Sequence, residues 1–374
     1  MDKKEKIQIE TGDCQGEMYW AWLCSIPGLY LPQQKILLQY LNHPEAVWKA
    51  SQKELEALGR EGYEWAKKVS WFQKKSTPAE RMHILGKRGI RFISFRNPGY
   101  PMRLRTLSNA PLGLFYKGSL PEEQCRAAAI VGARMCSRFG KDMAELIAGM
   151  IVVYGGQVIS GAAYGIDGVA QMEALRRGGR SYGILGCGVD VCYPKGNYLL
   201  FEQLEKQGGI ISEFPPGTPP LRSHFPMRNR LISGMSDMVI VVEARKKSGS
   251  LITADFAAEQ GREVYAVPGR PGEELSEGCN ELISQGAGIF LSPEQFAESV
   301  LVPMGMEKSK KSLQVTLAPS EELVYSSLGL HSKGLIELQE CTDMSLTELS
   351  DILLRLELKG LVRETSRNFY AKMK

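Results

Sequence analysis

Short apolar runs alternate with amphipathic segments through the middle of the chain. Ala127 to Val131 is a run of small and branched apolar residues, which is typical of a buried parallel strand. Apolar residues then recur at helical spacing over Met143, Ile147 and Met150, and a second strand is predicted over Gln157 to Ser160. Each predicted strand ends in a turn of small residues before a helix begins. This order predicts the opening of a doubly wound α/β sheet.

The same alternation continues on both sides of this stretch. Apolar runs predict further strands over 91–95, 114–117, 181–185, 209–212, 238–243, 263–267 and 289–291. Helices are predicted over 198–207 and 280–285, and another helix is predicted to start near Met227. The run 238–243 is mostly Val, Ile and Met, which indicates a central strand buried on both faces.

The N-terminal part has a different pattern, with short helical segments from residue 16 to residue 75 joined by Pro-Gly turns. Ser51 and Glu54 form a capping box that marks the start of one helix. The pattern resembles small SAM-like and helix-hairpin-helix domains, in which the Ile26-Pro27-Gly28 turn could meet a DNA backbone. Few basic residues flank that turn, which favours a packing or interaction module.

The C-terminal part begins after a polar linker at 305–318. Three helical segments and a strand-turn-strand predict a winged helix, a domain that usually binds duplex DNA. Basic and acidic residues are equal in number from 305 to 374, and the third helix begins with Glu348 and Asp351 and no base. This charge favours a protein-protein or self-association role. The predicted domains are 1–75, 76–304 and 319–374, with the linker at 305–318.

Composition and charge narrow the function classes. Hydrophobic residues make up 43% and charged residues 24%, as in ordinary globular proteins, and the net charge of +4 permits an anionic partner without demanding one. The eight cysteines form no C-x-x-C pair and the four histidines have no metal-ligand spacing, so we expect reduced thiols and no metal. The charged start, MDKKEKIQIETGD, is unlike a signal peptide, and no run reaches the ~20 apolar residues of a membrane span. We therefore expect a cytoplasmic protein without a membrane partner.

Two small-residue turns follow the strands predicted at 127–131 and 157–160. Helix N-termini at the carboxyl edge of a parallel sheet offer unpaired N–H groups and a partial positive charge, which suit anions. Gly132 and Gly161 remove side chains where a ligand could approach, and Arg134 adds a planar cation suited to phosphate. For Gly132 alone, close packing of strand against helix explains the glycine equally well.

Later loops add polar residues to the same edge of the predicted sheet. The segment 214–236 holds a cluster of basic, aromatic and amide side chains, namely Arg222, His224, Phe225, Arg228, Asn229 and Arg230. The cluster suits phosphates with stacked bases, and a solvated charged loop is the alternative. Ser248, Gly249 and Ser250 open another helix and form a cup of N–H and hydroxyl groups. Together, these loops predict an anion site.

Seven motifs, in order, resemble the DNA-processing protein A family (DprA, also called Smf). They are VGARMCSRFG, SGAAYGID, YPKGN, ISEFPPG, FPMRNRLISGMS, VVEARKKSGSLITADFAAEQGREVYAVPG and CNELISQGA, across about residues 76–300. The resemblance implies an extended Rossmann-like fold that binds no dinucleotide, has no cofactor and has no established catalytic activity. It also implies a homodimeric bacterial protein that binds single-stranded DNA and loads the RecA recombinase onto incoming strands in natural transformation.

The resemblance also implies roles for individual residues. The DNA-binding set is Gly132, Arg134, Ser137, Ser160, Gly161, Lys195, Phe225, Arg228, Asn229, Arg230, Ser248, Gly249 and Ser250. The segment CNELISQGAGIF implies a dimer interface with Leu282, Ile283 and Ile289. The family usually has a histidine where Gln171 stands here, and a glutamine can hydrogen-bond but cannot titrate.

A nucleotide-cleaving enzyme is the alternative function. Enzymes of the lysine-decarboxylase-like and phosphoribohydrolase type share the Rossmann core and resemble one another in a PGG-x-GT-x-x-E loop, whose Glu takes part in the chemistry. The corresponding loop here, Ser248 to Thr253, has no carboxylate at that place, and Asp255 is displaced from it. VGARMC also lacks the G-x-G-x-x-G spacing of dinucleotide oxidoreductases. We therefore expect a binding protein rather than an enzyme.

Overall fold

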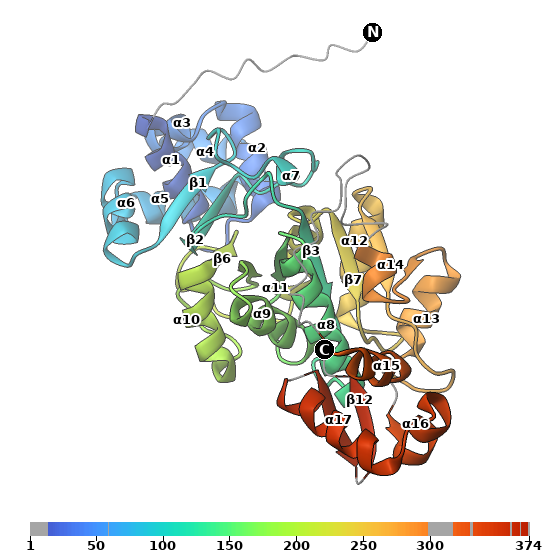
Figure 1. The fold of residues 1–374 in the computed structure, drawn as a ribbon. Helices are drawn as coiled ribbons and strands as arrows, with labels where there is room; N and C mark the ends of the chain where they lie inside the picture. Colours follow the sequence, from blue (N-terminus) through green and yellow to red (C-terminus); the bar gives the residue numbers. More distant parts are fainter. Residues whose placement is uncertain are drawn as a thin grey trace. The chain divides into compact units, whose positions relative to one another are not determined.

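The computed structural model describes residues 14–58, 60–297, 317–329, 332–359, 361–366 and 368–372 (Figure 1). The chain divides into two compact units, Met1–Pro303 and Met304–Lys374. The first unit contains the N-terminal helices together with a large sheet that has helices on both faces. The domain boundary expected after residue 75 lies inside this unit and stays a prediction.

Short helices form the N-terminal part of the first unit: α1 (Cys14–Cys24), α2 (Leu31–Leu41), α3 (Pro44–Lys49), α4 (Gln52–Glu56), α5 (Arg60–Lys75) and α6 (Pro78–Lys87). The capping box of Ser51 and Glu54 is confirmed at the start of α4. Trp22 of α1 is fully buried in an apolar cluster, and its indole N–H donates to the Ser76 carbonyl at 2.9 Å. This bond holds α1 against the connection between α5 and α6.

The sheet has nine strands: β1 (Arg91–Ser94), β2 (Gly113–Gly118), β3 (Ala127–Val131), β4 (Gln157–Ser160), β5 (Ser181–Ile184), β6 (Gly208–Ser212), β7 (Met238–Val241), β8 (Glu263–Ala266) and β9 (Gly288–Ile289). Their order is β1-β2-β6-β5-β4-β3-β7-β8-β9. Neighbours from β6 to β9 are parallel, and β1 and β2 are antiparallel at one edge. The chain order reverses around β3, between β4 and β7. Such a switch point is where doubly wound sheets bind ligands.

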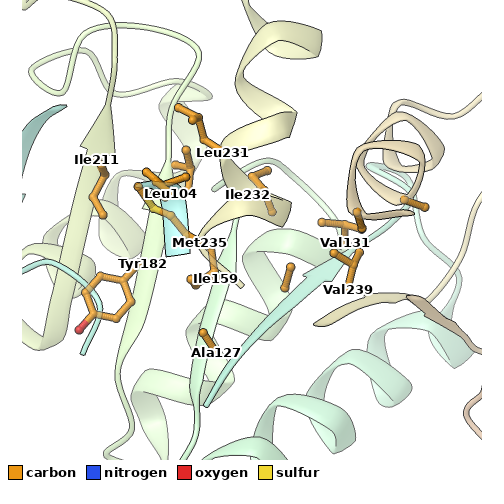
Figure 2. Packing of buried hydrophobic residues seen from close by; sticks show 14 of the residues in the cluster. Leu104, Ala127, Val131, Ile159, Tyr182, Ile211, Leu231, Ile232, Met235 and Val239 are labelled. Atoms are coloured by element: carbon orange, nitrogen blue, oxygen red, sulfur yellow. The ribbon is translucent and has the colours of Figure 1, made fainter. Parts of the chain in front are cut away.

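Helices cover both faces of the sheet: α7 (Met102–Arg105), α8 (Arg138–Val153), α9 (Ile166–Arg176), α10 (Tyr198–Gln207), α11 (His224–Gly234), α12 (Gly249–Glu259), α13 (Glu277–Ser284) and α14 (Pro293–Phe296). Val131 of β3 packs in one cluster with Leu231 and Met235 of α11 (Figure 2). The next face of the same strand differs, because Ala128 packs with Ile147 of α8. Since side chains alternate along a strand, β3 is buried on both faces.

Most predicted elements are confirmed, and the differences have local causes. The strands at 127–131 and 157–160 and the helix at 198–207 agree residue for residue with β3, β4 and α10. The start predicted near Met227 is wrong, because α11 already begins at His224. Pro226 thus lies in the first helical turn, where its missing N–H costs no hydrogen bond. Helix α13 likewise begins at Glu277, before the predicted start.

The second unit combines three helices with a small antiparallel sheet. These elements are α15 (Pro319–Ser327), α16 (Leu335–Thr342), α17 (Leu346–Leu358), β10 (Lys333–Gly334), β11 (Val362–Ser366) and β12 (Phe369–Lys372). Its core contains Val324, Leu338 and Leu353. Much of the predicted linker at 305–318 lies outside the described residues. Across the described parts of both units, no helix combines the length and apolar composition that a membrane crossing requires.

Candidate nucleic-acid interface

The loops after β3, β4, β5 and β7 meet at the carboxyl edge of the sheet. Backbone bonds join them: Ile166 N donates to Ala133 O at 3.2 Å, and Ala133 N donates to Glu243 O at 2.7 Å. Asn197, just before α10, donates through its side-chain amide to Ala162 O at 3.0 Å. The predicted convergence of these loops is therefore confirmed.

Glycines allow this close approach of the loops. A Cβ atom on Gly132 would lie 2.7 Å from Ile166 Cγ1, inside van der Waals contact. Gly165 has a φ of +76°, and a Cβ there would collide with the Ala133 carbonyl. The contacts of Gly132 are thus those of the packing explanation, in which the glycine lets strand and helix meet.

Rings and cations lie together on the exposed side of these loops, and we call Arg134, Tyr164, Tyr193, Lys195 and Phe225 the platform. The guanidinium carbon of Arg134 lies 5.5 Å from the centroid of the Phe225 ring. The Phe225 and Tyr193 centroids are 5.5 Å apart, with 33° between the ring planes. The Tyr164 hydroxyl accepts a hydrogen bond from the backbone of the loop that carries Lys195. Accessible rings beside cations provide what stacked bases and phosphates require.

Arg228 lies beneath the platform rather than on it. The side chain is almost fully buried and donates to the carbonyls of Gly161 and Ile184, at the ends of β4 and β5. Burial lowers the pKa of Arg228 to about 10, and the neighbouring Asp167 opposes that shift. Asp167 is itself buried and accepts a hydrogen bond from Gly161 N at 3.1 Å. Arg228 therefore remains a cation that braces two strand ends.

Three more of the expected contact residues are committed to internal bonds. Arg230 is buried and pairs with Glu213, with 2.6 Å between Nη2 and Oε2. Asn229 donates through Nδ2 to Gly249 O at 3.0 Å, which ties α11 to the start of α12. The fully buried Ser160 donates its hydroxyl to Ile130 O at 2.6 Å. These side chains shape the site from below.

A carboxylate occupies the N-terminus of α8, the first helix after a parallel strand. Glu243 accepts hydrogen bonds from both the backbone N–H and the hydroxyl of Ser137, the N-cap residue. A Cβ on Gly140 would collide with the same carboxylate. In dinucleotide-binding folds, the pyrophosphate sits at this helix terminus. Here Glu243 takes that place, so its negative charge would repel a phosphate.

The start of α12 remains partly open. Ser248 is the N-cap residue and accepts a hydrogen bond from Ser250 N at 3.4 Å, while the two hydroxyls lie 2.7 Å apart. Lys246 and Lys247 precede the cap and are exposed, whereas Ser250 is buried. Positive charge therefore continues from the platform side chains to a helix N-terminus.

The expected dimer residues differ in exposure. Leu282 and Ile283 of α13 are partly buried against the central apolar cluster, whereas Ile289 is 45% exposed on the edge strand β9. Gln171 hydrogen-bonds as expected: it accepts from Ala162 N at 3.0 Å and donates to Tyr182 O at 3.0 Å. Gln171 thus holds the turn after β4 against β5.

Several residues that build this site escaped the sequence reasoning. Tyr164 and Tyr193 stand inside the motifs SGAAYGID and YPKGN-containing VCYPKGN, next to the expected contact residues, which was the available signal. Asp167 and Glu243 gave none, because each acts on a partner far away in sequence. Among the described residues, no group of histidine, cysteine and carboxylate side chains could hold a metal ion.

Comparison with known proteins gives consistent matches. The family model described as DNA recombination-mediator protein A matches residues 91–301. Protein Smf from Synechocystis sp. is 30% identical over 93% of this chain and 96% of its own length.

Two solved structures are similar in fold as well as in sequence. DNA processing protein A from Streptococcus pneumoniae aligns with a TM-score of 0.65 and 33% identity, over 75% of this chain and 97% of that chain. DNA processing protein A from Helicobacter pylori, described as having a unique single-stranded DNA binding mode, aligns with a TM-score of 0.51 and 27% identity. That match covers 57% of this chain and 95% of the other.

Proposed function

We propose that this chain, which belongs to the DNA recombination-mediator protein A family (DprA, also called Smf), binds single-stranded DNA at the platform. A role as a DNA-processing recombination mediator follows from the family. We further propose that the chain loads the RecA recombinase onto the bound strand during natural transformation, in the cytoplasm. The Helicobacter pylori relative supports strand binding, since its structure is described by that property.

The observation that carries this proposal is the stacked pair of Arg134 and Phe225, at 5.5 Å, with Tyr193 beside it. Aromatic faces accept any base, and a neighbouring guanidinium neutralises phosphate, so this arrangement suits a strand without sequence preference. A duplex keeps its bases stacked inside and offers no ring to the platform. Affinity for single strands should therefore exceed affinity for duplex.

The buried bonds divide the expected DNA-binding residues into two groups. Direct contact is proposed for the accessible group: Arg134, Lys195, Phe225, Ser248 and Gly249, together with Tyr164 and Tyr193. A positioning role is proposed for those bonded inside the fold: Gly132, Ser137, Ser160, Gly161, Arg228, Asn229, Arg230 and Ser250. The second group holds the loops that present the first.

We propose no catalytic step for this chain. In phosphoribohydrolase-type enzymes, a glutamate stands in the loop that corresponds to Ser248–Thr253, and that loop has no carboxylate here. Glu243 is bound by Ser137 at the N-terminus of α8, and Asp167 is buried beside Arg228. Neither carboxylate is available to a substrate at the platform.

We also propose that the chain forms a homodimer through the face that includes Leu282, Ile283 and Ile289. The domain boundaries 1–75, 76–304 and 319–374 remain part of the proposal. For the second unit we propose a winged helix that contacts protein, because the first turn of α17 carries Glu348 and exposes Leu346. An acid there repels a phosphate backbone, whereas an exposed leucine suits a protein surface.

The proposal is tested by binding of fluorescent oligo-dT and of a duplex of equal length, across a salt series. Oligo-dT should bind more tightly, and its log affinity should fall linearly with log salt by about 0.7 per neutralised phosphate. A chain that ignores single strands even at low salt contradicts the proposal. Release of free base from nucleoside monophosphates would favour the enzyme instead.

A further inference from the structure

A groove of about 470 Å³ lies in the first unit, between the N-terminal helices and the segment that joins β6 to α11. Aromatic rings line it, among them Tyr30, Trp71, Phe72 and Phe214. Trp71 is 51% exposed at the mouth, with its ring 6.1 Å from the buried ring of Phe72. A half-exposed tryptophan over a ring-lined hollow is a surface on which a flat molecule can stack.

Two cations belong to the same lining. Lys75 Nζ lies 4.6 Å from the centroid of the Trp71 ring, so the cation and the exposed ring form one unit. Arg81 of α6 also lines the groove and is held by a 2.8 Å bond from Nε to Ser25 Oγ. A flat ligand with negative groups beside it would find complementary charge here.

The groove contains an unmatched buried acceptor. Glu213 lines it, with a side chain that is only 9% exposed. Its Oε2 accepts from Arg230 at 2.6 Å, whereas its Oε1 is buried and has no hydrogen-bond partner among the described residues. A buried acceptor without a donor is costly, so a ligand that offers an N–H group here removes a penalty.

Helix α11 connects this groove to the platform. His224 and Met227 line the groove, while Phe225 belongs to the platform and Arg228 braces it from below. The two sites are therefore separated by one helix, about 10 Å across. A strand that stacks on Phe225 has to cross only the start of α11 to reach Trp71.

We propose that the groove takes one base of the strand held at the platform, and that it favours bases with an exocyclic amine, such as cytosine, over thymine. The base lies against Trp71, its amine donates to Glu213 Oε1, and Lys75 and Arg81 meet the flanking phosphates. Thymine has no exocyclic amine and leaves Oε1 unmatched. This inference rests on the proposed function, because it needs a strand at the platform.

The test compares oligo-dC with oligo-dT on the full chain, with intrinsic tryptophan emission as a second readout. Oligo-dC should bind about tenfold more tightly than oligo-dT, and it should quench the exposed Trp71. Trp71→Ala should bring the oligo-dC affinity down to that of oligo-dT, and Trp71→Phe should retain part of the preference. Tyr40→Ala is the matched control, since Tyr40 is exposed on α2 and does not line the groove.

The outcomes separate this inference from the function beneath it. Equal, tight binding of oligo-dC and oligo-dT overturns the inference and leaves strand binding intact; the groove then falls to a protein partner. A preference for oligo-dC that survives in Trp71→Ala also overturns it. Quenching of Trp71 by free dCMP, but not by oligo-dC, assigns the groove to a free nucleotide. Failure of both strands to bind contradicts the proposed function itself.

Discussion

Arg134→Ala should weaken strand binding without weakening the fold. Arg134 is exposed, and its described contact is the ring of Phe225 at 5.5 Å, so its loss leaves no buried group unpaired. A hydrogen bond to a charged group contributes about 2 kcal/mol, which corresponds to about a thirtyfold loss in affinity for oligo-dT. One phosphate contact fewer should also reduce the salt slope by about 0.7.

Arg138→Ala is the matched control for this measurement. Arg138 is also exposed, begins α8 four residues later, and pairs with Asp142 at 3.2 Å, away from the platform rings. Fluorescence anisotropy across a salt series should show a change of less than about threefold for this variant. Equal losses in both variants would mean that general positive charge, rather than the platform, holds the strand. An unchanged salt slope in Arg134→Ala would refute the phosphate contact.

Three further outcomes are expected. Arg228→Ala leaves the buried carboxylate of Asp167 unpaired and should lower the free energy of unfolding by about 3 kcal/mol in urea titrations, so its effect on binding is indirect. Burial raises the pKa of Glu213 above its ordinary 4.5, so the folded chain holds a proton that the unfolded chain releases. Stability should therefore fall as pH rises above 4.5, and Glu213→Gln should flatten this dependence. Deletion of residues 307–374 should change oligo-dT affinity by less than about twofold, because no contact is proposed there; a large loss would place DNA on the second unit.

The pattern of apolar residues sufficed for the sheet because its information is local. Ala127–Val131 and Gln157–Ser160 are read correctly since a strand buried on both faces must be apolar along its whole length. The start of α11 was missed because Pro226 suggested a break, whereas proline is tolerated in a first turn. Local rules place the elements, and they err where one residue has two meanings.

The site shows where local reading ends. Arg134, Arg228 and Arg230 look alike in sequence, yet only Arg134 is exposed, because Asp167 and Glu213 engage the other two inside the fold. Likewise, the bond from Ser137 to Glu243 joins residues 106 apart and closes a helix N-terminus that the sequence offers to an anion. Which cation meets solvent depends on tertiary partners, and a single sequence does not reveal them.

The most direct test of the central claim is photo-crosslinking of a strand that carries 5-iodouracil, followed by mass spectrometry of the labelled peptides. A strand on the platform should label Phe225, Tyr193 or Tyr164, and excess unlabelled oligo-dT should suppress the labelling. Labelling confined to residues 319–374, or label on the first unit that oligo-dT does not displace, would contradict the claim that the platform holds single-stranded DNA.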